Sequence, residues 1–311
     1  MEIGIGAPVS GAWAGPAELA RFGALAEELG YDSLWTFQRL LAPADGGGGF
    51  VYQSVLDPLI ALGYLAAHTT RARLGVAVLN LPFVSPTHLA KQASTLDVLS
   101  GGRLDLGLGI GWSPLEFTAS NATTERRGAR AEEFVAALRA QWAESPVHFE
   151  GEFYTVPASR MDPKPVQQPG PPILLGGAVP AAMERAGRLA DGWISRSATV
   201  LSEIAADIAI VRNAAERAGR DPGAVRIVNR GVVRYDPTGV GTPDQDGKRL
   251  LLSGSAEQIR GDVAWLAEQG VTEVFYDLNW DPQVGDPAAD KTAALERAEE
   301  ILRALSPSAA G

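Results

Sequence analysis

The feature of this sequence that most constrains its fold is a regular alternation of short apolar runs with segments of helical period. Eight runs are typical of buried strands, at residues 3–7, 33–37, 73–79, 104–110, 173–176, 192–195, 225–233 and 271–278. Helices are expected between them, for example over 16–29, where Pro16 stands at the start and Gly30 just past the end. Strands that alternate with helices run parallel through right-handed crossovers, and eight such units allow a sheet to close. The sequence therefore predicts an α/β protein with a (β/α)8 barrel, and a doubly wound open sheet is the alternative.

The length of 311 residues suits a single barrel with additions. A (β/α)8 barrel takes about 250 residues and accepts insertions, so we expect residues 1–311 to form one domain. Two segments break the alternation and are interpreted as insertions: about 147–172, a hairpin followed by prolines, and about 235–253, rich in Gly, Pro and Asp. We expect both near the C-terminal ends of strands, where barrel active sites lie, and the second could be a lid or a mobile loop.

The residue types available restrict the chemistry. The chain has no cysteine, which excludes disulfides, thiolate metal sites and thiol nucleophiles. His68, His88 and His148 are far apart, none in a ligand spacing, so no metal site is predicted. There is no Gly-x-Ser-x-Gly nucleophile motif either. A barrel mouth rich in glycine and poor in acid–base groups favours an enzyme whose cofactor carries the chemistry.

Charge and hydropathy narrow the partners and the compartment. A net charge of −10 argues against nucleic acid or an anionic membrane as the main partner. No window offers the roughly 18 unbroken apolar residues of a membrane helix. The N-terminus enters an apolar run directly, without the pattern of a signal peptide. These observations predict a cytoplasmic protein that acts on a small molecule.

Glycines cluster at the predicted end of the fourth strand, in Gly107-Leu-Gly-Ile-Gly111, which Trp112 follows. Glycines within a strand either allow close packing inside the barrel or leave bare backbone for a flat ring. Trp112 either stacks on such a ring, lines a substrate pocket, or plugs the barrel. The residues alone leave these alternatives open.

Two further strand ends carry groups suited to an anion. Gly176-Gly-Ala178 precedes a helix that starts near Pro180, so free N–H groups and the helix dipole favour a phosphate there, although a plain tight turn is the alternative. Arg39 closes the second strand beside Gln38 and could meet a phosphate or a carboxylate, or pair with an acid such as Asp45. Gln38 and Arg39 are therefore candidates for polar contacts with substrate or cofactor.

Several separate segments, in order over residues 1–193, resemble one family. They are 29–35 (LGYDSLW), 89–103 (LAKQASTLDVLSGGR), 106–112 (LGLGIGW) with Glu116-Phe117, 163–173 (PKPVQQPGPPI), Gly176-Gly177 and 190–193 (ADGW). Together they are similar to the luciferase-like monooxygenase superfamily, and within it to the branch that depends on the deazaflavin coenzyme F420. Each segment is modest evidence, but the ordered set is specific.

The resemblance implies a barrel with an insertion, often a homodimer, whose cofactor lies across the strand mouths. It also implies a non-proline cis peptide nearest Ala77–Val78, where a bulge supports the tricyclic ring. The turn at Gly176-Gly177-Ala178 corresponds to the phosphate-binding turn. The cofactor-binding positions expected in this chain are Gln38, Arg39, Ala77, Val78, Asn80, Gly111, Trp112, Gly176, Gly177 and Ala178.

One departure from the family affects the expected reaction. Many relatives carry an Asp-His or Glu-His pair where this chain has Gln38-Arg39, and Trp112 occupies the position of a catalytic glutamate in one subgroup. We therefore assign no catalytic residue and no proton relay. The sequence predicts an F420-dependent oxidoreductase that transfers a hydride between the cofactor and a small organic substrate. The alternatives are an FMN-dependent luciferase-like monooxygenase, a non-catalytic flavin-binding barrel and, as a distant third, a metal-dependent barrel hydrolase.

Overall fold

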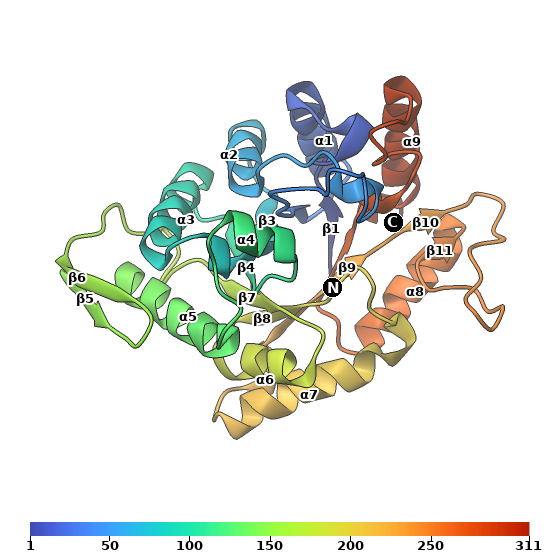
Figure 1. The fold of residues 1–311 in the computed structure, drawn as a ribbon. Helices are drawn as coiled ribbons and strands as arrows, with labels where there is room; N and C mark the ends of the chain where they lie inside the picture. The colour runs from blue at the N-terminus through green and yellow to red at the C-terminus, as the bar shows by residue number, and fades with distance from the viewer. Residues whose placement is uncertain (311) are drawn as a thin grey trace.

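In the computed structural model, which describes residues 1–310, eight parallel strands close into a barrel (Figure 1). Around the barrel their order is β1 (Glu2–Gly6), β12 (Glu273–Tyr276), β9 (Arg226–Gly231), β8 (Gly192–Ile194), β7 (Ile173–Gly176), β4 (Leu104–Gly109), β3 (Arg73–Asn80) and β2 (Ser33–Thr36). Each corresponds to one of the eight predicted strands. The predicted (β/α)8 barrel is confirmed, and the open-sheet alternative is wrong.

Helices surround the barrel and connect its strands (Figure 1). They are α1 (Pro16–Glu28), α2 (Pro58–His68), α3 (Pro86–Ser100), α5 (Arg127–Ala143), α6 (Pro180–Leu189), α7 (Ile204–Arg217), α8 (Ala256–Glu268) and α9 (Lys291–Ala304). A short extra helix that the sequence analysis missed, α4 (Pro114–Ala119), follows β4 directly. No helix within residues 1–310 is long and apolar enough to cross a membrane.

The barrel interior has its own apolar cluster, separate from the core between strands and helices. It consists of Trp35, Ala77, Leu174, Ile194, Val228 and Phe275. The rings of Trp35 and Phe275 stack with centroids 5.2 Å apart. Gly75 on β3 makes room for them, because a Cβ there would lie 2.3 Å from the Trp35 ring. This layer fills the barrel below its C-terminal rim.

A charged network closes the opposite, N-terminal end of the barrel. Asp105 is fully buried and accepts hydrogen bonds from Arg73 (2.6 and 2.7 Å) and Arg226 (2.8 and 3.2 Å). Arg226 also reaches Glu273 at 2.9 Å. Burial alone would raise the pKa of Asp105, but the two guanidinium groups outweigh it and hold that pKa below its ordinary value. Burial raises the pKa of Glu273.

The segment at 147–172 differs in placement from the expectation. Its hairpin, β5 (Val147–Glu150) and β6 (Thr155–Ser159), follows α5 and precedes β7, so it leaves the end of a helix and not the C-terminal end of a strand. The hairpin folds back along α5, where the Glu133 carboxylate accepts hydrogen bonds from three backbone N–H groups at its tip (2.7–2.9 Å). Figure 1 shows it outside α5. The expectation that this segment lies at a strand mouth was wrong.

The segment at 235–253 does follow the C-terminal end of β9, as expected. It runs between β10 (Arg234–Tyr235) and β11 (Ser253–Gly254), which pair with each other. Arg249 forms two hydrogen bonds with the Asp262 carboxylate of α8, at 2.6 and 2.7 Å, and the amide of Leu252 donates to the same carboxylate at 2.8 Å. These contacts attach the end of the segment to α8.

Candidate functional site

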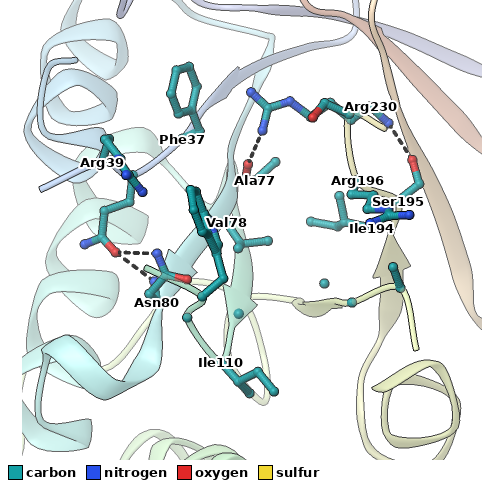
Figure 2. A pocket seen from close by; sticks show the side chains of 18 of the residues that line it. Phe37, Arg39, Ala77, Val78, Asn80, Ile110, Ile194, Ser195, Arg196 and Arg230 are labelled. Atoms are coloured by element: carbon teal, nitrogen blue, oxygen red, sulfur yellow. Dashed lines mark hydrogen bonds between the residues drawn. The ribbon is translucent and has the colours of Figure 1, made fainter. Parts of the chain in front are cut away.

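A cavity of about 420 Å³ lies at the C-terminal ends of the strands (Figure 2), within the usual size range of small-molecule sites. All ten residues selected from the sequence line it, although they are spread over 141 positions of the chain, from Gln38 to Ala178. They come from the ends of β2, β3, β4 and β7 and the residues that follow them. Parallel strands bring these ends to one rim, so the fold itself assembles the set. Whether these residues bind a cofactor stays a prediction.

Strand β3 is irregular where it borders the cavity. Its register against β4 shifts between Val76 and Leu79, and the Ala77–Val78 peptide is cis, as the resemblance implied. The Val78 side chain occupies space that glycines leave free, because a Cβ on Gly109 would lie 2.6 Å from its Cγ2 and one on Gly176 would lie 3.0 Å from its Cγ1. Backbone and Val78 together form one wall of the cavity.

The glycine run of β4 combines the two alternatives left open by the sequence, close packing inside the barrel and bare backbone at the cavity. Gly107 is a packing glycine, since a Cβ there would lie 2.0 Å from the carbonyl oxygen of Val76. Gly109 and Gly111 line the cavity. Gly111 also has a left-handed backbone, with φ of 73°. The bare backbone reaches the cavity only at the end of the run.

Gln38 and Asn80 form a pair at the cavity wall. The side-chain oxygen of Gln38 accepts from the backbone N–H of Asn80 at 2.9 Å and from its Nδ2 at 3.2 Å (Figure 2). These bonds leave the Nε2 of Gln38 as a donor and the Oδ1 of Asn80 as an acceptor that the pair can offer to a ligand.

Arg39 is paired with Glu116 on α4, and not with Asp45 as the sequence analysis considered. Its Nη1 lies 3.6 Å from Oε2 of Glu116, and the two side chains are only 4% and 2% exposed. The other carboxylate oxygen of Glu116 accepts from the backbone N–H groups of Leu40 (2.7 Å) and Leu41 (3.3 Å). The missed helix α4 thus supplies the charge partner of Arg39.

Two adjacent aromatic rings lie against the Arg39 guanidinium. Its central carbon lies 4.9 Å from the ring centroid of Tyr52 and 4.5 Å from that of Trp112. Trp112 is 60% exposed and stands at the rim, so it does not plug the barrel, which Trp35 and Phe275 fill. Tyr52 comes from a loop after β2 that the sequence analysis did not single out, and burial raises the pKa of its hydroxyl.

Arg230 is the main lining residue that sequence reasoning missed. It projects from β9 over the Phe37 ring at 4.8 Å, donates to Asp277 at 2.7 Å, and donates to the carbonyl oxygen of Ala77 at 3.1 Å (Figure 2). The predicted seventh strand ran to residue 233, whereas β9 ends at Gly231. The period-two pattern of Arg226, Val228 and Arg230 was the available signal.

The turn at Gly176-Gly177-Ala178 leads from β7 into α6. A Cβ on Gly177 would lie 2.4 Å from the Cβ of Ala182, so glycine lets the turn pack against the helix. The N-cap residue of α6, Val179, provides no side-chain acceptor for the first N–H groups. The turn thus combines cavity-lining backbone with an uncapped helix start, which suits an anion.

The charges at the cavity are mostly paired. Arg39 and Arg230 lie against the carboxylates of Glu116 and Asp277, while Arg196 is exposed at the rim. Within residues 1–310, no group of three or more His, Asp or Glu side chains is arranged to hold a metal ion. The site offers shape, bare backbone, amides and guanidinium groups, so its residues can bind and orient a reactive cofactor.

Comparison with known proteins agrees with this geometry. Residues 3–239 match the family model described as luciferase-like monooxygenase. An F420-dependent glucose-6-phosphate dehydrogenase of Microbacterium testaceum is 36% identical over 186 residues, covering 59% of this chain and 53% of that protein. An FMNH2-dependent dimethylsulfone monooxygenase of Pseudomonas putida is 34% identical over 176 residues, covering 55% of this chain and 47% of that protein. The chain thus spans about half the length of these two relatives.

A solved structure extends the similarity over the whole barrel. The monooxygenase RslO1 from Streptomyces bottropensis superposes with a TM-score of 0.78 at 25% identity, covering 99% of this chain and 100% of that one. The family match, which includes all of the cavity residues, agrees with the resemblance found in the sequence. The chain belongs to the luciferase-like monooxygenase family.

Proposed function

We propose that this protein is an F420-dependent oxidoreductase that transfers a hydride between the deazaflavin and a small organic substrate. The observation that carries the proposal is the cavity wall, where Val78 and the bare backbone of Gly109 and Gly176 form a support suited to a flat ring. The F420-dependent relative supports this cofactor, and the FMNH2-dependent relative keeps an FMN-dependent monooxygenase as the alternative.

The residues fit such a cofactor in three places. The ring would lie against Val78, and the free amide groups of Gln38 and Asn80 would contact its polar edge. Its phosphate would lie at the Gly176–Ala178 turn, before α6. When bound, the deazaflavin supplies the hydride chemistry; the protein holds the substrate beside it and keeps water out.

Titration with both cofactors tests the proposal. Purified protein is titrated with oxidised F420 and, separately, with FMN, and binding is followed by cofactor fluorescence. We expect a micromolar Kd for F420 and at least tenfold weaker binding of FMN, in line with the Gly-x-Gly-x-Gly-Trp run and the Gly-Gly turn. The reverse order would support the monooxygenase, and oxygen consumption with reduced FMN would then separate that enzyme from a simple flavin-binding protein.

We also propose that the protein is a homodimer. Ile60 and Tyr64 on α2 and Val98 and Leu99 on α3 are exposed, with Ile60 at 75%, and the two helices are neighbours in the barrel (Figure 1). A dimer is what the resemblance to the family implies, and exposed apolar side chains on two neighbouring helices are candidates for its interface. Sedimentation equilibrium should give twice the chain mass of 32.7 kDa, and Ile60→Lys should shift the protein to monomer. A monomer at micromolar concentration would contradict the proposal.

A further inference from the structure

The guanidinium of Arg39 is buried with an unused hydrogen-bonding edge. Within residues 1–310, its Nε has no hydrogen-bond acceptor although the side chain is only 4% exposed. The nearest carboxylate oxygen, on Glu116, is 3.6 Å from Nη1, which exceeds hydrogen-bond distance. The other oxygen of Glu116 is engaged by the amides of Leu40 and Leu41. Glu116 therefore compensates the charge of Arg39 without saturating its donors.

A buried donor without an acceptor is unfavourable, and native structures rarely keep one without a reason. A guanidinium carries five N–H donors, all in its plane. An additional acceptor must therefore approach along the edge of the guanidinium plane, while the adjacent rings of Tyr52 and Trp112 lie beside the group. Arg39 lines the cavity, so a bound molecule can supply that acceptor.

The surroundings of Arg39 favour a flat molecule. Phe37, Tyr52 and Trp112 all line the same cavity, and Trp112 is 60% exposed. Rigid aromatic surfaces select planar conjugated ligands through stacking. These groups follow the ends of β2 and β4, whereas the wall proposed for the cofactor ring is made by the strand ends themselves at Val78 and Gly109. Arg39 and its aromatic neighbours thus stand apart from the wall proposed for the ring, where a substrate beside the cofactor could contact them.

We propose that Arg39 binds the carbonyl or anionic oxygen of a planar, conjugated substrate whose ring stacks on Trp112. This inference rests on the proposed function, because it assigns the substrate class to the same cavity. It makes Arg39 a specificity-determining residue for aromatic ketones, quinones and related oxygen-bearing ring compounds. Small aliphatic alcohols and sugar phosphates lack the flat surface that Trp112 and Tyr52 would contact.

The test uses 2-hydroxy-1,4-naphthoquinone, a planar anion, as the probe. Calorimetric titration into protein loaded with oxidised F420 should give a micromolar Kd for the probe. Cyclohexanecarboxylate, which has an anionic oxygen and no planar ring, should bind at least tenfold more weakly. In Arg39→Met the Kd of the probe should rise at least tenfold, while the Kd of F420 changes less than threefold.

Two further variants separate recognition from packing. The double variant Arg39→Met/Glu116→Gln removes both charges, so no unpaired charge is left buried. A cooperative thermal unfolding transition is the control that it is folded. It should lose affinity for the probe as Arg39→Met does. Glu116→Gln alone keeps the guanidinium and should bind the probe at least as tightly as the unmodified protein. Equal loss of probe affinity in Glu116→Gln would show that the cluster acts through packing, and would overturn the inference.

The failure of this inference is distinguishable from failure of the proposed function. Protein that binds F420 but not the probe, or a folded double variant that binds the probe normally, overturns the role of Arg39 and leaves the F420 proposal intact. A parallel rise in both Kd values in Arg39→Met would assign Arg39 to the cofactor and also overturn the inference. Absence of F420 binding overturns the proposed function, and the probe titration repeated without cofactor still decides the role of Arg39.

Discussion

The substitution Gly109→Ala tests whether a flat ring rests on the wall formed by Val78. A Cβ at this position would lie 2.6 Å from Cγ2 of Val78 and 3.2 Å from Oδ1 of Asn80. Carbon atoms in contact are ordinarily 3.5–4.0 Å apart, so the Val78 side chain must move by about 1 Å. Val78 borders the cavity, which gives its side chain room to move into the space proposed for the ring.

The magnitude follows from the cost of overpacking. Adding a methyl group to a closely packed site costs about 1–3 kcal/mol. If Val78 must return to its original position when the ring binds, the binding free energy becomes less favourable by this amount. The Kd of F420 then rises about 5- to 140-fold. Fluorescence titration measures the Kd, and thermal unfolding shows how much of the cost is borne by the free protein.

A matched control is available at Gly261 on α8, where an added Cβ would meet nothing within 4 Å. Gly261→Ala should leave the Kd of F420 unchanged and stabilise the protein by about 0.5–1 kcal/mol, because glycine is unfavourable within a helix. A folded Gly109→Ala protein that binds F420 as tightly as the unmodified protein would refute the placement of the ring against Val78.

Three further predictions concern the charged network around Asp105 at the N-terminal end of the barrel and the turn at Gly176–Ala178. Asp105→Asn leaves the guanidinium groups of Arg73 and Arg226 without their buried carboxylate and should destabilise the protein by about 3–5 kcal/mol, seen as a lower urea midpoint. Because the pKa of Asp105 is lower in the folded protein, its carboxylate stabilises the fold fully above the pKa of an unfolded Asp, and this stabilisation is lost as the pH falls below about 4. Acid unfolding should therefore start there, and the stability of Asp105→Asn should depend less steeply on pH. Gly177→Ala, whose Cβ would lie 2.4 Å from that of Ala182, should weaken binding of F420 more than binding of a phosphate-free deazaflavin; equal weakening of both would contradict a phosphate at this turn.

The strands were predictable because parallel strands buried on both faces consist of short, continuous runs of apolar residues. Helix starts were also predictable, since Pro16 and Pro180 each stand at the beginning of a helix. The position of the 147–172 hairpin was not predictable from its own residues. It depends on packing against α5, where the Glu133 carboxylate binds the hairpin tip.

The candidate site was predictable where strand ends are marked by glycines or by an ordered family motif. It was not predictable where a contact joins distant segments. Arg39 finds its charge partner in Glu116, 77 positions along the chain, and no local pattern distinguishes that acid from Asp45. Arg230 was missed because the predicted strand ran two residues too far, to residue 233, and so placed the rim beyond the true end of β9 at Gly231.

The layers of the barrel explain why ligand chemistry is confined to its C-terminal rim. The indole N–H of Trp35 donates to Glu273 at 2.7 Å and to Ser33 at 2.8 Å, so the aromatic layer is hydrogen-bonded to the charged floor below it. Trp35 fits inside the barrel because Gly75 leaves space for its ring. Because these two layers fill the lower part of the barrel, a ligand can enter only above them, where the strand ends supply Val78, glycine backbone and paired arginines. A site built on strand ends over a packed support holds its wall in place without help from mobile loops, which is the condition for orienting a substrate at hydride-transfer distance.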